Sequence, residues 1–151
     1  AGTVKGRAMA FELSGFDLVQ FVAATLAEDL GPTGRDVTSE SVIPADACFS
    51  GVMDSRDAIT VAGLPIAAAF FRHLDPEIEI EHLIEDGQQV SSGADLMRIR
   101  GKARAMLTAE RSALNIVQHL SGIATLTRQY VDAIAGTGCT LLDTRKTIPD
   151  N

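Results

Sequence analysis

Residues 107–128 read LTAERSALNIVQHLSGIATLTR, and residues 141–149 read LLDTRKTIP. The first stretch predicts a helix, because its apolar residues recur at the three- and four-residue spacing of one helix face. The second predicts the end of an apolar strand that leads into two adjacent cations, Arg145 and Lys146. Together with Arg111 in the helix, these cations suit a small ligand that carries several negative charges.

The predicted helix covers about 103–120, is interrupted at 121–122 and resumes over 124–135. At about 100° per residue, Glu110 falls inside its broad apolar arc and Arg111 at the edge of that arc. A buried carboxylate without a partner is strongly unfavourable, so we expect Glu110 to form a structural ion pair whose loss costs roughly 3–5 kcal/mol. Arg111 lies where the helix surface passes from core to solvent, and a guanidinium fork suits a planar carboxylate.

The remaining segments alternate between helical and extended patterns. Helices are predicted over 16–30 and 64–74, strands over 47–53, 58–62, 78–83 and 95–100, and a loop over 31–44. This order predicts an α+β fold up to about residue 135. After a turn at 136–138, residues 139–143 have the composition of a buried strand. A lone strand cannot satisfy its backbone groups, so this one predicts the start of another unit.

The composition is that of a globular chain, and it sets limits on possible partners. The 151 residues are 46% hydrophobic and 22% charged, which fits one ordinary domain or one domain plus a fragment. A net charge of −7 argues against nucleic-acid binding, which requires a basic surface. No run approaches the ~18 apolar residues of a membrane span, and residues 1–15 lack a signal-peptide pattern, so we expect a cytoplasmic protein.

Residues that could carry metal or nucleophilic chemistry are isolated from one another. Cys48 and Cys139 stand far apart in the sequence, and we expect both to be free thiols. The histidines at 73, 82 and 119 have no spacing that indicates a metal site or a nucleophile with its base. The basic run formed by Arg98, Arg100, Lys102 and Arg104 is typical of a solvated face.

Five short motifs resemble one enzyme family in residue type, order and spacing. They are EDLG at 28–31, DVTSESVIP at 36–44, ER-x-x-LN at 110–115, LSGIAT at 120–125 and DTRKT at 143–147. Each motif alone is weakly specific, but together they resemble the quinolinate phosphoribosyltransferases, the decarboxylating enzymes of de novo NAD synthesis. The resemblance covers about residues 18–149.

The resemblance implies a division of the chain into three parts. Residues 1–15 would be a flexible arm, 16–135 an α+β amino-terminal domain (an open sandwich with a long helix), and 136–151 the start of an α/β barrel whose remainder is absent. The strand at 139–143 would be the first strand of that barrel. After Pro149 the sequence departs from the family's usual Gly-Leu-Arg. We therefore expect an amino-terminal half that is inactive alone.

The resemblance also implies a reaction and its site. The complete enzyme would join quinolinate to 5-phosphoribosyl-1-diphosphate and release diphosphate and CO2 to give nicotinate mononucleotide, with Mg²⁺ held mainly by the phosphoribosyl diphosphate. Arg111 would reach a substrate carboxylate across a dimer interface, so we expect a homodimer or larger homo-oligomer. Thr144, Arg145 and Lys146 would hold the dicarboxylate end of the site, and Asp143 would orient its neighbours. No residue of this chain is expected to act as a catalytic nucleophile.

Two other interpretations remain open at this stage. A paralogue of the same fold, of the kind encoded with molybdate transporters, would act on another heteroaromatic acid. Residues 85–103, EDGQQVSSGADLMRIRGKA, also resemble the hammerhead of biotinyl or lipoyl carrier domains, or a non-catalytic binding module. A carrier needs a lysine beside methionine at a hairpin tip, but Met53 precedes Asp54 and Met97 precedes Arg98.

Overall fold

The computed structural model of this chain describes residues 14–144. Its helices are α1 (Leu18–Leu30), the 3-10 turn η1 (Gly31–Thr33), α2 (Val37–Val42), α3 (Leu64–Leu74) and α4 (Ala103–Ile134). Its strands are β1 (Cys48–Asp54), β2 (Ile59–Thr60), β3 (Glu79–His82), β4 (Gln89–Val90) and β5 (Asp95–Lys102). The mixture of helices and antiparallel strands confirms the α+β prediction, and α3 has the predicted bounds.

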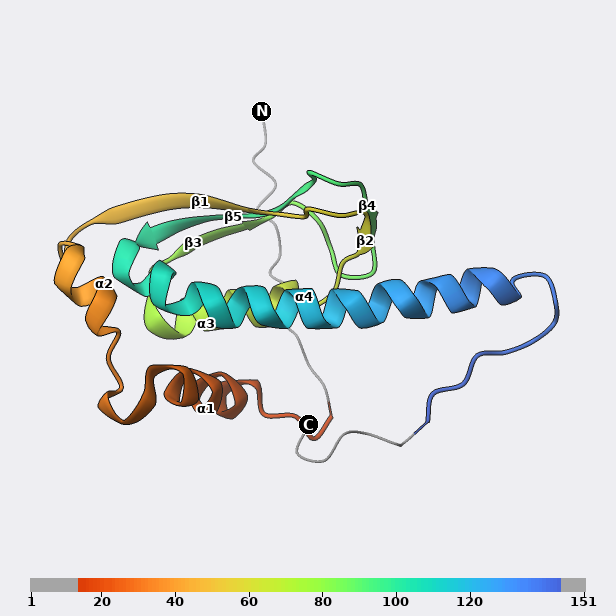
Figure 1. The fold of residues 1–151 in the computed structure, drawn as a ribbon, viewed down its shortest axis with the longest axis horizontal. Helices are drawn as coiled ribbons and strands as arrows, with labels where there is room; N and C mark the ends of the chain where they lie inside the picture. Colours follow the sequence, from red (N-terminus) through yellow and green to blue (C-terminus); the bar gives the residue numbers. More distant parts are fainter. Residues whose placement is uncertain (1–13, 145–151) are drawn as a thin grey trace.

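The described residues form three layers (Figure 1). β1, β5 and β3 pair antiparallel in that order, and α3 and α4 lie against one face of this sheet. α1 packs against α3 on the side away from the sheet. The short β2–β4 pair lies near the middle of α4, and the last turns of α4 extend beyond the strands.

The core lies between the sheet and the two long helices. The sequence of α3, LPIAAAFFRHL, contributes six buried apolar side chains to it: Leu64, Ile66, Ala67, Ala68, Phe70 and Phe71. Gly63 begins this helix in the left-handed region, with φ 97°. The carboxylate of Asp86 accepts hydrogen bonds from the backbone N–H groups of Gly63 (2.8 Å) and Leu64 (3.1 Å), which satisfies two donors at the helix start.

A buried carboxylate joins the end of α3 to β5. Asp75, 2% exposed, accepts hydrogen bonds from the backbone N–H groups of Glu77 (3.2 Å) and Lys102 (2.9 Å). Only glycine fits at position 101, since a Cβ there would lie 2.6 Å from Ile78 Cγ1 and 2.8 Å from Asp75 Oδ2. This junction determines where β5 ends and α4 begins.

Three predictions of secondary structure are wrong, and each depends on whether the segment meets a partner distant in sequence. The loop predicted over 31–44 contains η1 and α2. The interruption predicted at 121–122 does not occur, and α4 is one helix of 32 residues. Residues 139–143 do not form a strand and are exposed, because no strand within residues 14–144 lies beside them to pair with their backbone groups.

No helix among the described residues combines the length and apolar character needed to cross a membrane.

Candidate functional site

Arg111 lies on the outer side of α4 and faces the end of α1. Its side chain is 77% exposed, which agrees with the predicted position at the edge of the apolar arc. Arg111 Nη1 lies 3.5 Å from Asp29 Oδ1, and Ser112 Oγ donates a hydrogen bond to Asp29 Oδ2 at 3.4 Å. Asp29 belongs to the EDLG motif, so two of the five motifs, far apart in sequence, meet here.

Glu110 does not form the buried ion pair predicted for it. Its side chain is exposed, and within residues 14–144 no cation pairs with it. The helical spacing places Glu110 in the direction of the apolar face, but at this turn of α4 the face borders an open groove instead of packed side chains. A stability loss of several kcal/mol on removal of Glu110 is therefore no longer expected; an exposed substitution of this kind changes stability by about 0.5 kcal/mol or less.

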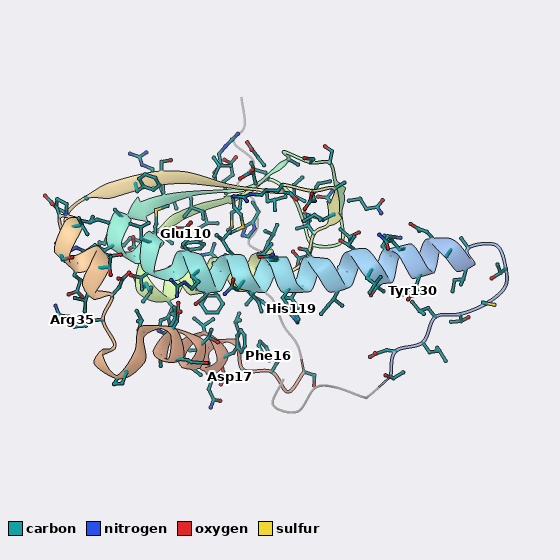
Figure 2. All side chains as sticks on the ribbon, viewed as in Figure 1. Phe16, Asp17, Arg35, Glu110, His119 and Tyr130 are labelled. Atoms are coloured by element: carbon teal, nitrogen blue, oxygen red, sulfur yellow. The ribbon has the colours of Figure 1, made fainter. Side chains whose placement is uncertain are left out.

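The groove beside Glu110 separates β1 from α4 and has a volume of about 810 Å³. β1 contributes Phe49, Gly51 and Met53, and Leu107 and Leu114 line the groove from α4 on either side of Glu110. Figure 2 labels Glu110 on the half of α4 that lies under the sheet and Tyr130 on the half that extends past it. The groove thus offers a mostly apolar cleft whose lining also includes three carboxylates, Asp54, Asp57 and Glu110. Arg111 follows Glu110 in the sequence but is not among the lining residues.

The DVTSESVIP motif anchors α2 to the start of α4. Asp36 caps α2 by accepting hydrogen bonds from Ser39 N (3.0 Å) and Ser39 Oγ (2.6 Å), and Thr108 Oγ1 of α4 donates to it at 3.1 Å. The hydrogen bond from the Ser39 side chain is the main cause that lowers the pKa of the Asp36 carboxyl, and Thr108 lowers this pKa further. Arg35 donates a hydrogen bond to Glu40 (Nε to Oε2, 2.9 Å), which lowers the pKa of Glu40.

The basic run at 98–104 divides into a solvated part and a structural part. Arg98 and Arg100 are exposed, as predicted, and Arg98 lies 3.5 Å from Glu81. Arg104 is half-buried and differs from the prediction. It donates hydrogen bonds to the backbone carbonyls of Ile43 (2.7 Å) and Glu40 (3.1 Å), so its guanidinium holds the end of α2 on α4.

The LSGIAT motif joins α4 to the segment between β2 and α3. Ser121 Oγ accepts a hydrogen bond from the backbone N–H of Ala62 (3.0 Å) and donates one to the Ala62 carbonyl (3.2 Å). Thr125 Oγ1 accepts a hydrogen bond from the backbone N–H of Thr60 (2.9 Å) and donates one to the Ser121 carbonyl (2.6 Å). The polar residues of this motif are therefore structural, which the local sequence did not indicate.

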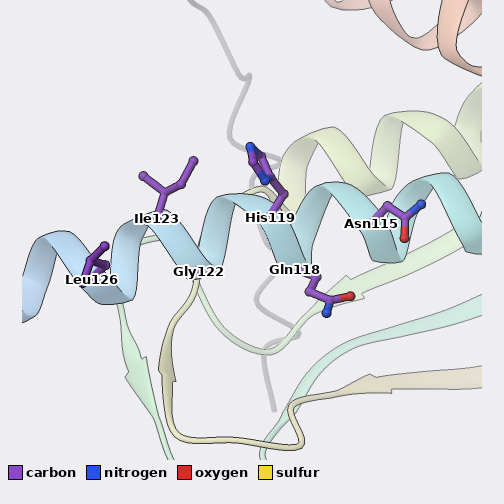
Figure 3. Close-up of a pocket in the computed structure, with 6 residues that line it drawn as sticks. All are labelled: Asn115, Gln118, His119, Gly122, Ile123 and Leu126. Atoms are coloured by element: carbon purple, nitrogen blue, oxygen red, sulfur yellow. The ribbon is translucent and has the colours of Figure 1, made fainter. Parts of the chain in front are cut away.

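A shallow hollow that overlaps this motif carries no convergent chemistry. Its six lining residues, Asn115, Gln118, His119, Gly122, Ile123 and Leu126, all come from α4. Figure 3 shows His119 and Ile123 pointing to one side of the helix and Gln118 to the opposite side. Elsewhere within residues 14–144, no three His, Cys, Asp or Glu side chains gather closely enough to hold a metal ion.

The DTRKT motif reaches the end of the described residues. Asp143 and Thr144 are exposed and have no regular secondary structure. Arg145 and Lys146, predicted to bind substrate, lie outside the described residues. Of the four predicted site residues, Arg111 and Thr144 can therefore be located, and Arg111 is the one whose surroundings the structure defines.

Comparison with known proteins shows which family the chain belongs to. Residues 36–121 match the family model described as "Quinolinate phosphoribosyl transferase, N-terminal domain". The chain belongs to the quinolinate phosphoribosyltransferase family. It is 40% identical over 134 residues to the chloroplastic nicotinate-nucleotide pyrophosphorylase [carboxylating] of Arabidopsis thaliana, covering 89% of this chain and 38% of that protein. It is 38% identical over 133 residues to the enzyme of the same name from Mycobacterium leprae, covering 85% of this chain and 45% of that protein.

Solved structures of this family share the architecture. The chain superimposes on the nicotinate-nucleotide pyrophosphorylase of Francisella tularensis with a TM-score of 0.80 and 36% identity, covering 87% of this chain and 46% of that one. It superimposes on NadC from Streptococcus pyogenes with a TM-score of 0.84 and 31% identity, covering 93% of this chain and 50% of that one. The chain thus spans half or less of the length of the relatives it matches.

Proposed function

We propose that the complete protein transfers a phosphoribosyl group from 5-phosphoribosyl-1-diphosphate to quinolinate and releases diphosphate and CO2 to form nicotinate mononucleotide. Membership of the quinolinate phosphoribosyltransferase family supports this reaction, and so do the names of the relatives from A. thaliana and M. leprae. The observation that carries the proposal in this chain is Arg111, whose guanidinium is 77% exposed on the outer side of α4.

Quinolinate carries two carboxylates, and the chain supplies the groups that would neutralise and orient them. A guanidinium can hold a planar carboxylate through two parallel N–H···O bonds, and Arg111 makes no hydrogen bond within residues 14–144 that would occupy its donors. Thr144, Arg145 and Lys146 would hold the same end of the substrate through a hydroxyl and two charges. These residues bind and orient, and orientation of two reactants contributes to the rate by itself.

Diphosphate oxygens are hard ligands of the kind that Mg²⁺ prefers, so we propose that the ion enters the site mainly on the phosphoribosyl diphosphate. This ion would supply charge neutralisation for the departing diphosphate. The residues that hold the phosphate and diphosphate would belong to the α/β barrel. In this division of the chain, 1–15 would be a flexible arm, 16–135 the amino-terminal domain and 136–151 the start of the barrel.

We further propose that the protein is cytoplasmic. We also propose that it is at least dimeric, because Arg111 points outward from α4 and would serve a site on a second copy. Sedimentation of the complete protein at micromolar concentration should show a dimer or larger species, and a monomer would contradict the in-trans role. The 151-residue chain alone should release no CO2 from quinolinate and phosphoribosyl diphosphate above background.

Steady-state kinetics of the Arg111→Ala variant of the complete protein test the substrate role. Loss of a charge-assisted contact, about 1.5–3 kcal/mol, should raise the KM for quinolinate about ten- to a hundredfold. Arg128→Ala is the matched control, because Arg128 is another exposed arginine of α4 and lies on its projecting part. Equal kinetics for the two variants would contradict the role of Arg111.

The choice of acid substrate distinguishes the proposed reaction with quinolinate from that of a paralogue acting on another heteroaromatic acid. Nicotinate has one carboxylate where quinolinate has two, so it should not replace quinolinate if two anionic groups are required. A paralogue acting on another heteroaromatic acid is less favoured, because the relatives reported above are named for nicotinate-nucleotide formation. Measured turnover with a monocarboxylic acid that exceeds turnover with quinolinate would reverse this preference.

A further inference from the structure

We infer that Asp29, the carboxylate at the end of α1, is a positioning residue that orients Arg111 toward the substrate. The inference rests on the proposed function, since it concerns how Arg111 is presented to a substrate carboxylate. It assigns a role to the EDLG motif, whose sequence alone showed only a family resemblance and a helix end.

Asp29 is itself held in place from two directions. α1 ends directly after it at Gly31, which adopts φ 66° and donates its backbone N–H to the carbonyls of Ala27 and Glu28. Ser112 Oγ donates a hydrogen bond to Asp29 Oδ2 at 3.4 Å, and Ser112 is only 6% exposed. The Asp29 side chain is 26% exposed, so it is largely shielded at its base while its Oδ1 faces Arg111.

The contact between Asp29 and Arg111 orients the guanidinium without occupying it. Nη1 and Oδ1 are 3.5 Å apart, which is longer than a charge-assisted hydrogen bond of about 2.7–2.9 Å. Guanidinium has five N–H donors in a planar fork, so a single loose contact at Nη1 leaves the rest of the fork available to a planar anion. The carboxyl end of a helix carries partial negative charge, and the end of α1 therefore favours the cation at the same place.

Arg104 on the same helix shows what a structural arginine looks like in this protein. It is half-buried and donates to two backbone carbonyls at 2.7 and 3.1 Å. Arg111 is 77% exposed and makes only the 3.5 Å contact with Asp29. An exposed ion pair of this kind contributes little to stability, so orientation of a ligand-binding group is the better account of it.

The test is Asp29→Asn in the complete protein, with Glu28→Gln as its matched control. The amide is nearly isosteric with the carboxylate and can still accept the hydrogen bond from Ser112 Oγ, so the substitution removes mainly the charge. Glu28 is the preceding residue, is exposed, and its side chain contacts no donor within residues 14–144, so its replacement removes the same charge from the same turn. We expect Asp29→Asn to raise the KM for quinolinate about three- to fivefold, the range of one exposed charge pair, with the KM for phosphoribosyl diphosphate and the melting temperature matching the control.

A double variant distinguishes this inference from the proposed function. If Asp29 acts through Arg111, adding Asp29→Asn to Arg111→Ala should change the quinolinate KM no further. An effect of Arg111→Ala without any effect of Asp29→Asn would overturn the positioning role and leave the proposed function intact. Absence of an effect of Arg111→Ala would overturn the proposed function itself. An Asp29→Asn protein that melts well below the Glu28→Gln control would assign the carboxylate a structural role and also overturn the inference.

Discussion

The two halves of α4 share one helical geometry but differ in what holds them. The first half, residues 103–121, buries seven side chains: Ala103, Met106, Ala109, Ser112, Ala113, Val117 and Ser121. The second half, residues 122–134, buries none, and its last turns extend past the strands (Figure 1). The comparison separates two sources of helix stability, since tertiary packing acts on the first half while intrinsic propensity and side-chain pairs act on the second.

The largest expected difference between the halves comes from one substitution made in each. Val117 is 6% exposed and Val131 is 40% exposed, and both lie on α4. Val117→Ala should lower the free energy of unfolding by about 2–3 kcal/mol, because buried apolar contacts are lost and a cavity remains. Val131→Ala should change it by about 0.5 kcal/mol or less, because alanine is the better helix former and little burial is lost.

Urea unfolding of the two valine variants measures this difference directly. If both variants lose the same stability, the projecting half of α4 is covered in the protein by residues beyond 14–144, and the comparison between packed and projecting halves fails.

The second effect concerns the hydrogen bonds at the boundary between the halves. Thr125→Val removes the acceptor for the backbone N–H of Thr60 and should cost about 1–2 kcal/mol, because a partly buried donor is left without a partner. Thr127→Val makes the same side-chain replacement two residues further along α4, at an exposed position, and should leave the stability nearly unchanged. Thermal melting of the pair is sufficient, and equal melting temperatures would show that α4 does not depend on the strand contact.

The third effect is smaller and depends on pH. Asp36 ties α2 to Thr108 in the packed half, and Asp36→Ala should lower the free energy of unfolding by roughly 1 kcal/mol near neutral pH through loss of the helix cap. Hydrogen bonds to Asp36 lower its pKa in the folded state from the ordinary 3.8. The charged carboxylate therefore stabilises the fold fully above 3.8, and this contribution disappears as pH falls through the lower folded pKa.

Unfolding of wild type and Asp36→Ala across a pH series tests this sign. The difference between them should shrink as the solution becomes more acidic. The exposed Asp46, whose carboxylate receives no hydrogen bond within residues 14–144, provides the control, since Asp46→Ala removes a carboxylate without removing a helix cap. A difference that grows with acidity would contradict the assigned role of Asp36.

The smallest effect has the opposite sign and lies where the halves meet. Gly122 is exposed within α4, and nothing within 4 Å would meet a Cβ there. Gly122→Ala should raise the free energy of unfolding by about 0.5–1 kcal/mol, since alanine loses less backbone entropy in a helix. Denaturant midpoints compare it with wild type, and destabilisation would show that position 122 needs glycine for a close contact with the rest of the protein.

The sequence predicted most elements because their signals are local. The bounds of α3 follow from Pro65 in its first turn and the apolar run that ends at Leu74, and the end of α1 follows from Gly31. Alternation of apolar residues located β3 and β5 in the same way. α2 was missed because its end is held by Arg104, which donates to the carbonyls of Glu40 and Ile43 from more than 60 positions away.

What the sequence by itself determined was most of the longer elements, the direction of each side chain along α4 and the family motifs, which predict a substrate role for Arg111. The tertiary structure decided which residues or open spaces those side chains face. Glu110 points toward the apolar side of α4 and is nevertheless exposed, because β1 and α4 leave a groove at that turn. Arg111 points outward and meets Asp29, because the end of α1 lies against α4. Helical periodicity fixes the direction in which a side chain leaves the helix axis. Whether that side chain is buried, and which residue it contacts, depends on residues that the chain brings together only on folding.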